Sequence, residues 1–455
     1  MIKVSLINEG KENSPEVISH AAKSCYQDNA LKWGEVIDIK NRLFETGHHT
    51  TLQHIYFTFF IEDIAVGDVT FGLHLASPFY NTSQRSGRFC GKMFANPDYE
   101  KIKGYVQEYW PEVTKNVLQE LMDYVKYGIE VYNSNFQNAT VKAEEFIQKE
   151  RPNANEKYIK MNGSKIAQEQ LRMFIPVIFP TALDFTINLS ALAALYRVAW
   201  SAPMKDVTQK MVSLVLKKYP EFDYMFARKE DIDSRDNAPV NILSLVPSIT
   251  TEPTLKLISP GDWKWCKNPQ PDDLHPLDLL HFSPWLMNNN VEEIKTFIGI
   301  SVATMGQDQR HRTIRRGQPI FYGGLYLPPI PKNLGLEKKA FEVVERWGYV
   351  HKKISLTLAC VLAPYGAIVG YQKSASYNAV IHESAKRLCW CAQEEIYHLA
   401  RSLRTQLASE TENKHPLLEI MSPCCVVTGK CGEGVRYCGR DLKKIKDDPF
   451  PERCV

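Results

Sequence analysis

The chain has 455 residues, enough for two or three ordinary domains, and 44% of them are hydrophobic, which can supply a core for each. Its 55 Lys and Arg against 52 Asp and Glu give a net charge of +3, which argues against a protein that mainly coats a nucleic-acid backbone. No apolar run of about 18 residues could span a bilayer, and eleven cysteines in so long a chain do not suggest a secreted disulfide framework, so a cytoplasmic protein is predicted.

Four features recur in the same order in the two halves of the chain. They are the short strands expected at 2–7 and 255–259, the histidine pairs His48/His54 and His275/His281, the segments 55–61 and 282–286 that follow these pairs, and the helical pairs Asn188/Arg197 and Asn378/Arg387. Both members of each histidine pair stand six apart, and both Asn/Arg pairs stand nine apart. This recurrence predicts a tandem duplication.

The repeat predicts two units, residues 1–240 and 250–455, with a linker within 234–254, where helical periodicity is absent. His54 and His281 are 227 positions apart, whereas Arg197 and Arg387 are only 190 apart, so about 37 extra residues are expected in the first unit. The apolar spacing of 99–165 predicts that these form a helical insertion. Each unit is expected to be α+β, with a small antiparallel or mixed sheet and long helices.

The densest polar segment is 307–318, which holds four arginines within seven residues, at 310, 312, 315 and 316. Guanidinium groups bind phosphates with two hydrogen bonds and stay charged at any working pH, so the segment is a candidate anion clamp. A solvated basic loop is the alternative interpretation.

Two motifs resemble the signature of the flavin-dependent thymidylate synthases. Residues 47–59, Gly-His-His-Thr-Thr-Leu-Gln-His-Ile-Tyr-Phe-Thr-Phe, are similar to the Gly-His-x-x-x-x-x-His-x-x-Phe-Thr-Phe segment of that family. In the second half, Gln307 precedes Arg310-His311-Arg312 with the family's spacing. The resemblance covers most of both halves and implies a tandem-duplicated form of this family.

The two units depart from the family signature in complementary ways. The second has Arg315, Gln318, Ile320 and Tyr322 where the family has Ser, Glu, Ser and Arg. The first lacks the Arg-His-Arg, around residues 75–78, but its residues 84–89, Gln-Arg-Ser-Gly-Arg-Phe, resemble the family's Glu-x-Ser-x-Arg-Tyr.

Two further family landmarks are divided in the same manner. An Arg four residues before a Pro is kept as Arg172 in the first unit, whereas the second has Cys360 there. The helix-ending Arg is followed by the family's Ala-Gln-x-Glu-Ile only at Arg387, because Arg197 is followed by Ala202-Pro203-Met204-Lys205.

In the family, each site is assembled between subunits of a homotetramer, so the complementary losses predict one composite site. It would take Gln307, Arg310, His311, Arg312 and Arg387 from the second unit and Gln84, Ser86, Arg88 and Arg172 from the first. A homodimer would then mimic the four-unit assembly. The sequence leaves open whether the two halves of a site meet within one chain or across the dimer.

The resemblance implies FAD-dependent methylation of dUMP to dTMP, with NADPH and methylenetetrahydrofolate as cosubstrates. The groups expected to bind the dUMP phosphate are Gln84, Ser86, Arg88 and Arg172. Gln307 and Arg310 would bridge nucleotide and flavin, and Arg387 would polarise the uracil, so Arg310 and Arg387 are the expected catalytic residues. The expected cofactor contacts are His54, His281, Arg310, His311, Arg312, Thr313, Asn378 and His382, although a single His on a strand is more often structural.

Other activities stay open at this stage. Gln84 for Glu and Arg315 for Ser leave room for a related C5 modification of a pyrimidine nucleotide, such as hydroxymethylation. A non-catalytic nucleotide sensor is a second alternative. A nucleic-acid-binding protein that uses residues 310–316 is a third, but the balanced charge and the absence of a known module argue against it.

The cysteine-rich tail, with Cys424, Cys425, Cys431 and Cys438, could hold zinc or an iron–sulfur cluster, although its spacings match no common paired Cys-x-x-Cys site. Reduced structural cysteines are the alternative, and the family chemistry requires no metal. Pro423-Cys424 resembles the nucleophile of the unrelated classical thymidylate synthases, but the surrounding pattern is missing and no cysteine nucleophile is expected.

Overall fold

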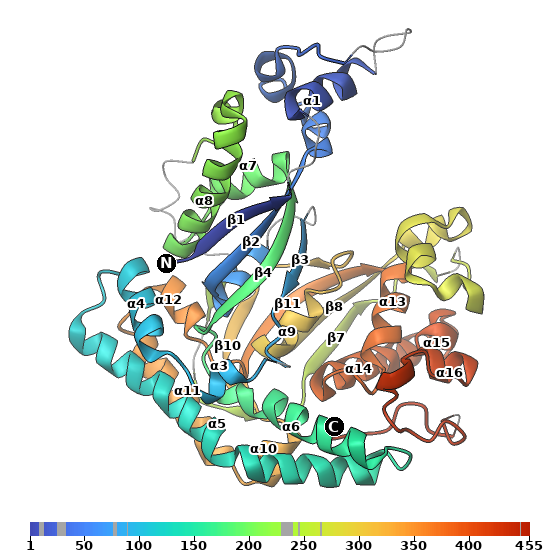
Figure 1. Cartoon of the computed structure of the whole chain (residues 1–455). Helices are drawn as coiled ribbons and strands as arrows, with labels where there is room; N and C mark the ends of the chain where they lie inside the picture. The colour runs from blue at the N-terminus through green and yellow to red at the C-terminus, as the bar shows by residue number, and fades with distance from the viewer. Residues whose placement is uncertain are drawn as a thin grey trace.

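The computed structural model describes residues 1–8, 13–24, 33–75, 80–88, 90–228, 240–243, 246–263, 266–445 and 447–455. Two separate sheets lie in the middle of the molecule, and helices pack around them (Figure 1). The predicted α+β class is confirmed. Residues 234–239 and 244–245 of the predicted linker, and residues 76–78 and 89 of the sequence comparison, lie outside the described residues.

The first sheet has the strand order β1-β2-β4-β3, with every neighbouring pair antiparallel. Its strands are β1 (Lys3–Asn8), β2 (Tyr56–Ala65), β3 (Tyr80–Gln84) and β4 (Pro180–Asn188). Phe57, Phe59 and Ile61 alternate along β2 and are fully buried, as expected for a strand with one face toward the core. The helices α7 (Leu189–Val198) and α8 (Ala202–Lys218) follow β4, and α8 packs against β1 and β2.

The second sheet repeats this topology. Its main path is β5-β10-β11-β8-β7, and the order β7-β8-β11-β10 within it corresponds to β1-β2-β4-β3. The strands are β5 (Asn241–Ile242), β6 (Ile249–Thr250), β7 (Thr254–Ser259), β8 (Glu293–Ser301), β9 (Arg315–Arg316), β10 (Ile320–Tyr326) and β11 (Ala367–Ser376). Helices α13 (Tyr377–Arg387) and α14 (Glu394–Glu410) follow β11 as α7 and α8 follow β4. The shared topology supports the predicted duplication.

The two units face each other across an approximate two-fold axis. Pro176 and Pro364, which precede the last strands of their sheets, form an antiparallel bridge with each other. Beside it, Val177 N donates to Ala363 O (2.9 Å) and Tyr365 N donates to Ile175 O (2.8 Å). Contact between equivalent positions is the signature of a two-fold interface, here within one chain. One hydrophobic core runs through both units.

The strand registers correct the landmark alignment predicted from the sequence. Asn188 caps α7, with its side chain accepting from Ala191 N (2.8 Å), and the equivalent cap of α13 is Ser376, which accepts from Ala379 N (3.3 Å). Asn378 therefore lies inside α13, two residues past the position equivalent to Asn188. The pairing of Arg197 with Arg387 is wrong by the same two residues.

The histidine landmarks are also not equivalent. Phe59 in β2 pairs with Phe185, three residues before the cap Asn188, and Thr296 in β8 pairs with Lys373, three residues before the cap Ser376. Equivalent residues of β2 and β8 are therefore 296 − 59 = 237 positions apart. The two caps are only 376 − 188 = 188 positions apart. The first unit is thus longer by 237 − 188 = 49 residues, rather than 37. In addition, residues 284–290 after His281 form a 3-10 helix and not a strand.

The region of the predicted insertion is helical. It contains α4 (Tyr99–Tyr109), α5 (Lys115–Glu150) and α6 (Glu156–Leu171), and α5 and α6 pack as an antiparallel hairpin along one side of the molecule (Figure 1). The side chains of Thr114 and Asn155 cap α5 and α6 by accepting from backbone N–H groups. The hairpin packs against α10 (Pro329–Asn333) and α11 (Glu337–His351) of the second unit and delivers Arg172 at its end.

Shorter helices complete the fold. They are α1 (Ser14–Lys23), η1 (Lys40–Phe44), η2 (His49–His54), α2 (Val66–Thr70), η3 (Leu73–Leu75), α3 (Lys92–Ala95), η4 (Arg172–Phe174), η5 (Pro220–Met225), η8 (Pro271–Leu274), η9 (Asp278–Phe282), η10 (Pro284–Asn290), α9 (Val302–Asp308), α12 (Leu356–Val361), α15 (Leu417–Ile420), α16 (Cys424–Thr428) and η11 (Gly434–Arg436). Among the described residues, none of the helices has both the length and the apolar character that crossing a bilayer would take.

Asp68 in α2 makes the stability of the fold depend on pH. It is 1% exposed, and its only hydrogen bond within the described part of the chain comes from Tyr105 OH (2.7 Å). Burial raises the pKa of Asp68 to about 7, and Tyr105 only partly offsets this. Because the folded state holds this proton more tightly than the unfolded state, Asp68 should reduce stability progressively as the pH rises from about 4 to about 7.

We therefore expect Asp68→Asn to remove a stability loss of about 4 kcal/mol between these pH values, measured by urea unfolding of both proteins. Asp63 is the control. Partial burial raises its pKa, but hydrogen bonds from Lys101 and Lys3 outweigh this and lower it, so the Asp63 contribution is lost as the pH falls. Equal pH profiles for the wild type and Asp68→Asn would contradict the assignment.

Candidate active site

Segments of both units meet at one place within a single chain. Arg88 Nη2 of the first unit donates to Cys391 O (3.3 Å), and Arg172 Nη2 donates to Gln393 Oε1 (3.4 Å). In the opposite direction, Arg312 Nη2 donates to Thr82 O (2.8 Å) in β3. We call the cluster of Arg88, Arg172, Gln307, His311, Arg387 and Gln393 the inter-unit site.

Arg172 lies at the buried end of this site. It is 5% exposed, and its guanidinium carbon is 5.1 Å from the centre of the Tyr365 ring. Burial lowers the pKa of Arg172, and Tyr365 and Glu169 partly counter that effect. A Cβ at Gly87 would stand 3.1 Å from Arg172 Nη1, so glycine lets the loop after β3 lie directly on the guanidinium group. Glu169 forms an ion pair with Arg88 on the same side.

Gln393 connects the two units, although the sequence analysis did not select it. Its Oε1 accepts hydrogen bonds from both Arg172 and the Gln307 side chain. Gln393 Nε2, Gln307 Oε1 and Arg172 Nε are buried and have no partner among the described residues. Because a buried polar atom without a partner costs free energy, donors and acceptors gathered in this way fit a polar ligand. The family-like Ala-Gln-x-Glu-Ile motif was the signal that could have identified Gln393.

Arg387 is held by the backbone and side chain of the Arg310–Arg312 turn. Its Nε donates to His311 Nε2 (2.8 Å), and its Nη2 donates to Gln307 O (2.7 Å). Burial, then the charges of Arg387 and Lys373, hold the pKa of His311 well below its usual value. His311 is therefore neutral, with its proton on Nδ1, since Nε2 accepts. The His382 ring lies against it, with 5.4 Å between ring centres.

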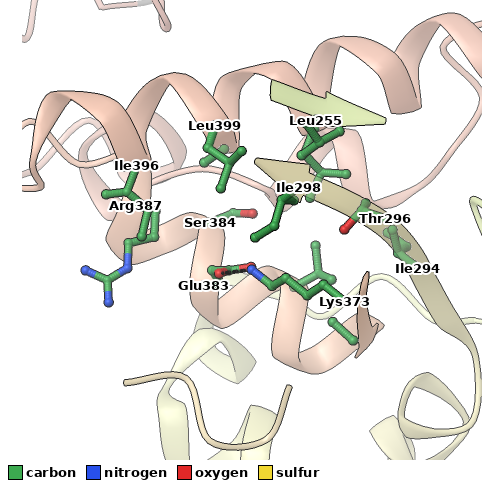
Figure 2. A pocket seen from close by; sticks show the side chains of 14 residues that line it. Leu255, Ile294, Thr296, Ile298, Lys373, Glu383, Ser384, Arg387, Ile396 and Leu399 are labelled. Carbon is green, nitrogen blue, oxygen red and sulfur yellow. Dashed lines mark hydrogen bonds and ion pairs between the residues drawn. The ribbon is translucent and has the colours of Figure 1, made fainter. Parts of the chain in front are cut away.

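An apolar pocket lies beside Arg387, between the second sheet and the helices α13 and α14 (Figure 2). Ile298, Leu399 and Leu255 line it, and Lys373 and Glu383 form an ion pair across it. Arg387 stands at one end of the pocket, where its guanidinium group points away from the apolar side chains. The free space in this pocket is only about 20 Å³, room for about one water molecule, so the pocket does not itself accommodate an aromatic ring.

The four arginines of 310–316 have different environments, so the expected four-residue anion clamp is wrong. Arg316 is paired with buried Asp308 and also donates to Ile314 O (2.8 Å) and His311 O (3.2 Å), which shapes the turn. Arg315 pairs with Glu293, and Arg312 is bound to Asn81 and Thr82. Arg310 is exposed. It is the one arginine of the four whose guanidinium group forms no hydrogen bond or ion pair with a described residue. The segment is thus no continuous basic surface for a nucleic acid.

The other predicted site residues divide into two groups. Ser86 Oγ accepts from Arg88 N (3.2 Å) in the loop that reaches the inter-unit site, and Gln84 is the last residue of β3, just before that loop. Thr313 is exposed next to Arg312. By contrast, Asn378 Nδ2 donates to Leu286 O (3.1 Å) and Asn290 Oδ1 (2.9 Å), which fixes η10.

Of the two predicted histidines His54 and His281, only His54 has a described side chain, and it lies away from the inter-unit site. His54 ends η2 and is exposed, and η2 packs against α1 and α7 of the first unit. His281 lies in η9, and its side chain is outside the described residues.

These groups form a candidate anion-binding site at the junction of two α+β units, with the arginine and amide groups that nucleotide-binding enzymes use. Residues 5–221 match the family model described as Thymidylate synthase complementing protein. This segment, just under half of the chain, is therefore similar to the flavin-dependent thymidylate synthases, as the motifs predict, which supports a thymidylate-synthase-like enzyme. No curated protein sequence matches the chain.

Solved structures give weaker similarities. Thymidylate synthase X from Helicobacter pylori, with FAD and dUMP, is 16% identical, and the match covers 52% of this chain and 100% of that one, with a TM-score of 0.35. The UMP/dUMP methylase PolB from Streptomyces cacaoi, bound with 5-Br dUMP, is 17% identical over 48% of this chain and 91% of that one, with a TM-score of 0.30. TM-scores of this size are too low to support an inference.

Proposed function

We propose that this protein is a flavin-dependent enzyme that methylates dUMP to dTMP, with methylenetetrahydrofolate as the one-carbon donor and NADPH as the reductant. The observation that carries the proposal is the inter-unit site, where the family-like residues of both units converge. There, one buried polar atom each of Gln307, Gln393 and Arg172 has no hydrogen-bond partner in the described part of the chain. Bound FAD would supply the hydride chemistry.

Different residues of the site would bind the phosphate, the uracil and the flavin, according to where they lie. Arg172 and Arg88, with Ser86 and Gln84, would hold the nucleotide phosphate, because two guanidinium groups and the loop after β3 approach each other there. Arg387, held rigidly by His311 and Gln307, would contact the uracil and favour its electron-rich form. Exposed Arg310 would contact the flavin or the nucleotide, with His382 and Thr313 as further flavin contacts.

Within one chain, the two units provide one site with this full set of residues. The position related to it by the approximate two-fold axis lacks them, because Cys360 stands where Arg172 would be and Ala199 stands where Arg387 would be. We propose that a homodimer, if it forms, carries two such sites, one in each chain.

The test is a spectrum followed by an assay. We expect flavin absorbance in the purified protein, or after adding FAD, and dUMP-dependent oxidation of NADPH in the presence of methylenetetrahydrofolate. Mass analysis of the nucleotide should show an added methyl group, and an added hydroxymethyl group would establish the related C5 modification instead. A protein that gains no flavin absorbance with FAD would overturn the proposal.

A further inference from the structure

Five cysteines line one small cavity next to the inter-unit site. Cys389 and Cys391 belong to the loop between α13 and α14, Cys425 to α16, and Cys431 and Cys438 to the segments on either side of η11. Figure 1 shows α15 and α16 beside α14, so the tail returns to this loop. The sequence singled out the tail cysteines, but it gave no sign that Cys389 and Cys391 would join them.

The thiols are close to one another. Cys389 and Cys391 are separated by one residue and their side chains interact, and Cys425 lies within electrostatic reach of Cys389, Cys431 and Cys438. Glu433 N donates to Cys431 Sγ (3.4 Å). No cysteine among the described residues forms a disulfide.

Arginines surround the cavity, and the Glu433 carboxylate also lines it. Arg440 lines it and lies 4.6 Å from the centre of the Trp390 ring. Arg151 interacts electrostatically with Cys391 and Cys438, and Arg453 with Cys389. Four thiolates around one divalent metal carry a net charge of about −2, and nearby arginines would balance it.

We propose that this cavity binds one Zn²⁺ through four of the five thiols Cys389, Cys391, Cys425, Cys431 and Cys438. Four thiolate ligands in tetrahedral geometry are the preferred set for structural zinc. Among the described residues, no three His, Cys, Asp or Glu side chains are placed where they could hold a metal ion, so zinc binding requires the thiols to move closer together. The four thiols release their protons to solvent as the four Zn–S bonds form.

The zinc would fix the loop that carries the site residues. Cys391 O accepts from Arg88, Trp390 O from Arg151 Nη2 (3.0 Å), and Ala392 O from Arg453 Nη2 (2.8 Å). Arg387 immediately precedes this loop, and Gln393 ends it. A metal at the cavity would therefore stabilise the loop between these two residues, independently of which reaction the enzyme performs.

Metal analysis of the purified full chain tests the proposal, and we expect about one zinc per chain. Because four of the five thiols are ligands, at least one of Cys425→Ser and Cys438→Ser should lower the zinc content at least about tenfold. Cys424→Ser is the matched control, because the Cys424 thiol is exposed and contacts Thr428 Oγ1 and Lys430 O (both 3.4 Å) instead of the cavity. That variant should keep its zinc.

A second measurement does not depend on whether the variants fold. Cobalt exchanged into the wild-type protein should give the thiolate-to-metal charge-transfer band and the visible absorption of a tetrahedral site. Wild-type protein without zinc, or zinc retained in both Cys425→Ser and Cys438→Ser, would overturn the proposal. Iron with inorganic sulfide, or a Cys389–Cys391 disulfide in metal-free protein, would overturn it as well.

Discussion

Arg88→Ala and Arg310→Ala chains are each expected to lose at least about 100-fold in turnover, and mixing them is expected to restore nothing. Arg88 lies on the first unit and Arg310 on the second, but both are close enough to Arg387 of the same chain to interact with it electrostatically. Arg312, two residues after Arg310, is bound to β3 of its own chain. Each mixed assembly would therefore contain only sites that lack one of the two arginines.

The measurement is turnover of each variant alone, of a refolded mixture and of co-expressed chains. Arg315→Ala is the matched control within the same loop, because Arg315 is 72% exposed and pairs with Glu293 rather than facing the inter-unit site. It should keep near wild-type turnover. Recovery in the mixture would show that the two halves of a site come from different chains, which would contradict the single-chain arrangement.

The family-like motifs predicted the two-unit plan and the groups that converge. Arg172 and the loop at 86–88 are 84 positions apart, yet Gly87 lies against Arg172, as their shared assignment to the phosphate requires. The sequence correctly predicted that these groups lie close together, because each assignment used a motif of several residues whose spacing is restricted by backbone geometry.

Single spacings predicted less. The nine-residue spacing in Asn188/Arg197 and Asn378/Arg387 suggested equivalence, but equivalence is set by the strand ladders and the caps Asn188 and Ser376. A local spacing contains no information on strand register. The alignment of Asn188 with Asn378, and of Arg197 with Arg387, is therefore wrong by two residues.

The sequence also could not sort the four arginines of 310–316. Their roles depend on partners far along the chain, such as Thr82 for Arg312, or on how the turn folds, as for Arg316 and Asp308. The same holds for the cysteine cavity, because Cys389 and Cys391 meet the tail only after α14 has folded between them. Burial of a charge is a tertiary property that composition does not reveal.

Asp308→Ala is expected to destabilise the protein by about 3–5 kcal/mol and to abolish turnover. Asp308 is fully buried, and Lys373 Nζ (2.6 Å), Tyr371 OH (2.9 Å) and Arg316 all bind its carboxylate. Burial raises the pKa of Asp308, but the charges of Arg316 and Lys373 outweigh this and hold it well below its usual value. Its removal would leave Arg316 buried without its carboxylate partner, and the turn that carries Arg310 and His311 would lose its anchor.

Urea unfolding of the variant measures the loss, with Glu293→Gln as the control because its partner Arg315 is exposed and the pair should contribute less than about 1 kcal/mol. The low pKa adds a pH test: the stabilisation by Asp308 is present above the ordinary carboxyl pKa of 3.8 and is lost as the pH falls through the folded value. The difference between wild type and Asp308→Ala should thus shrink in acid. If the difference stays constant from neutral to acid pH, the stabilisation does not come from the ionised carboxylate. In that case the turn at 309–314 must be held by its backbone contacts to Arg316, and Arg316→Met rather than Asp308→Ala should then cause the larger loss of turnover.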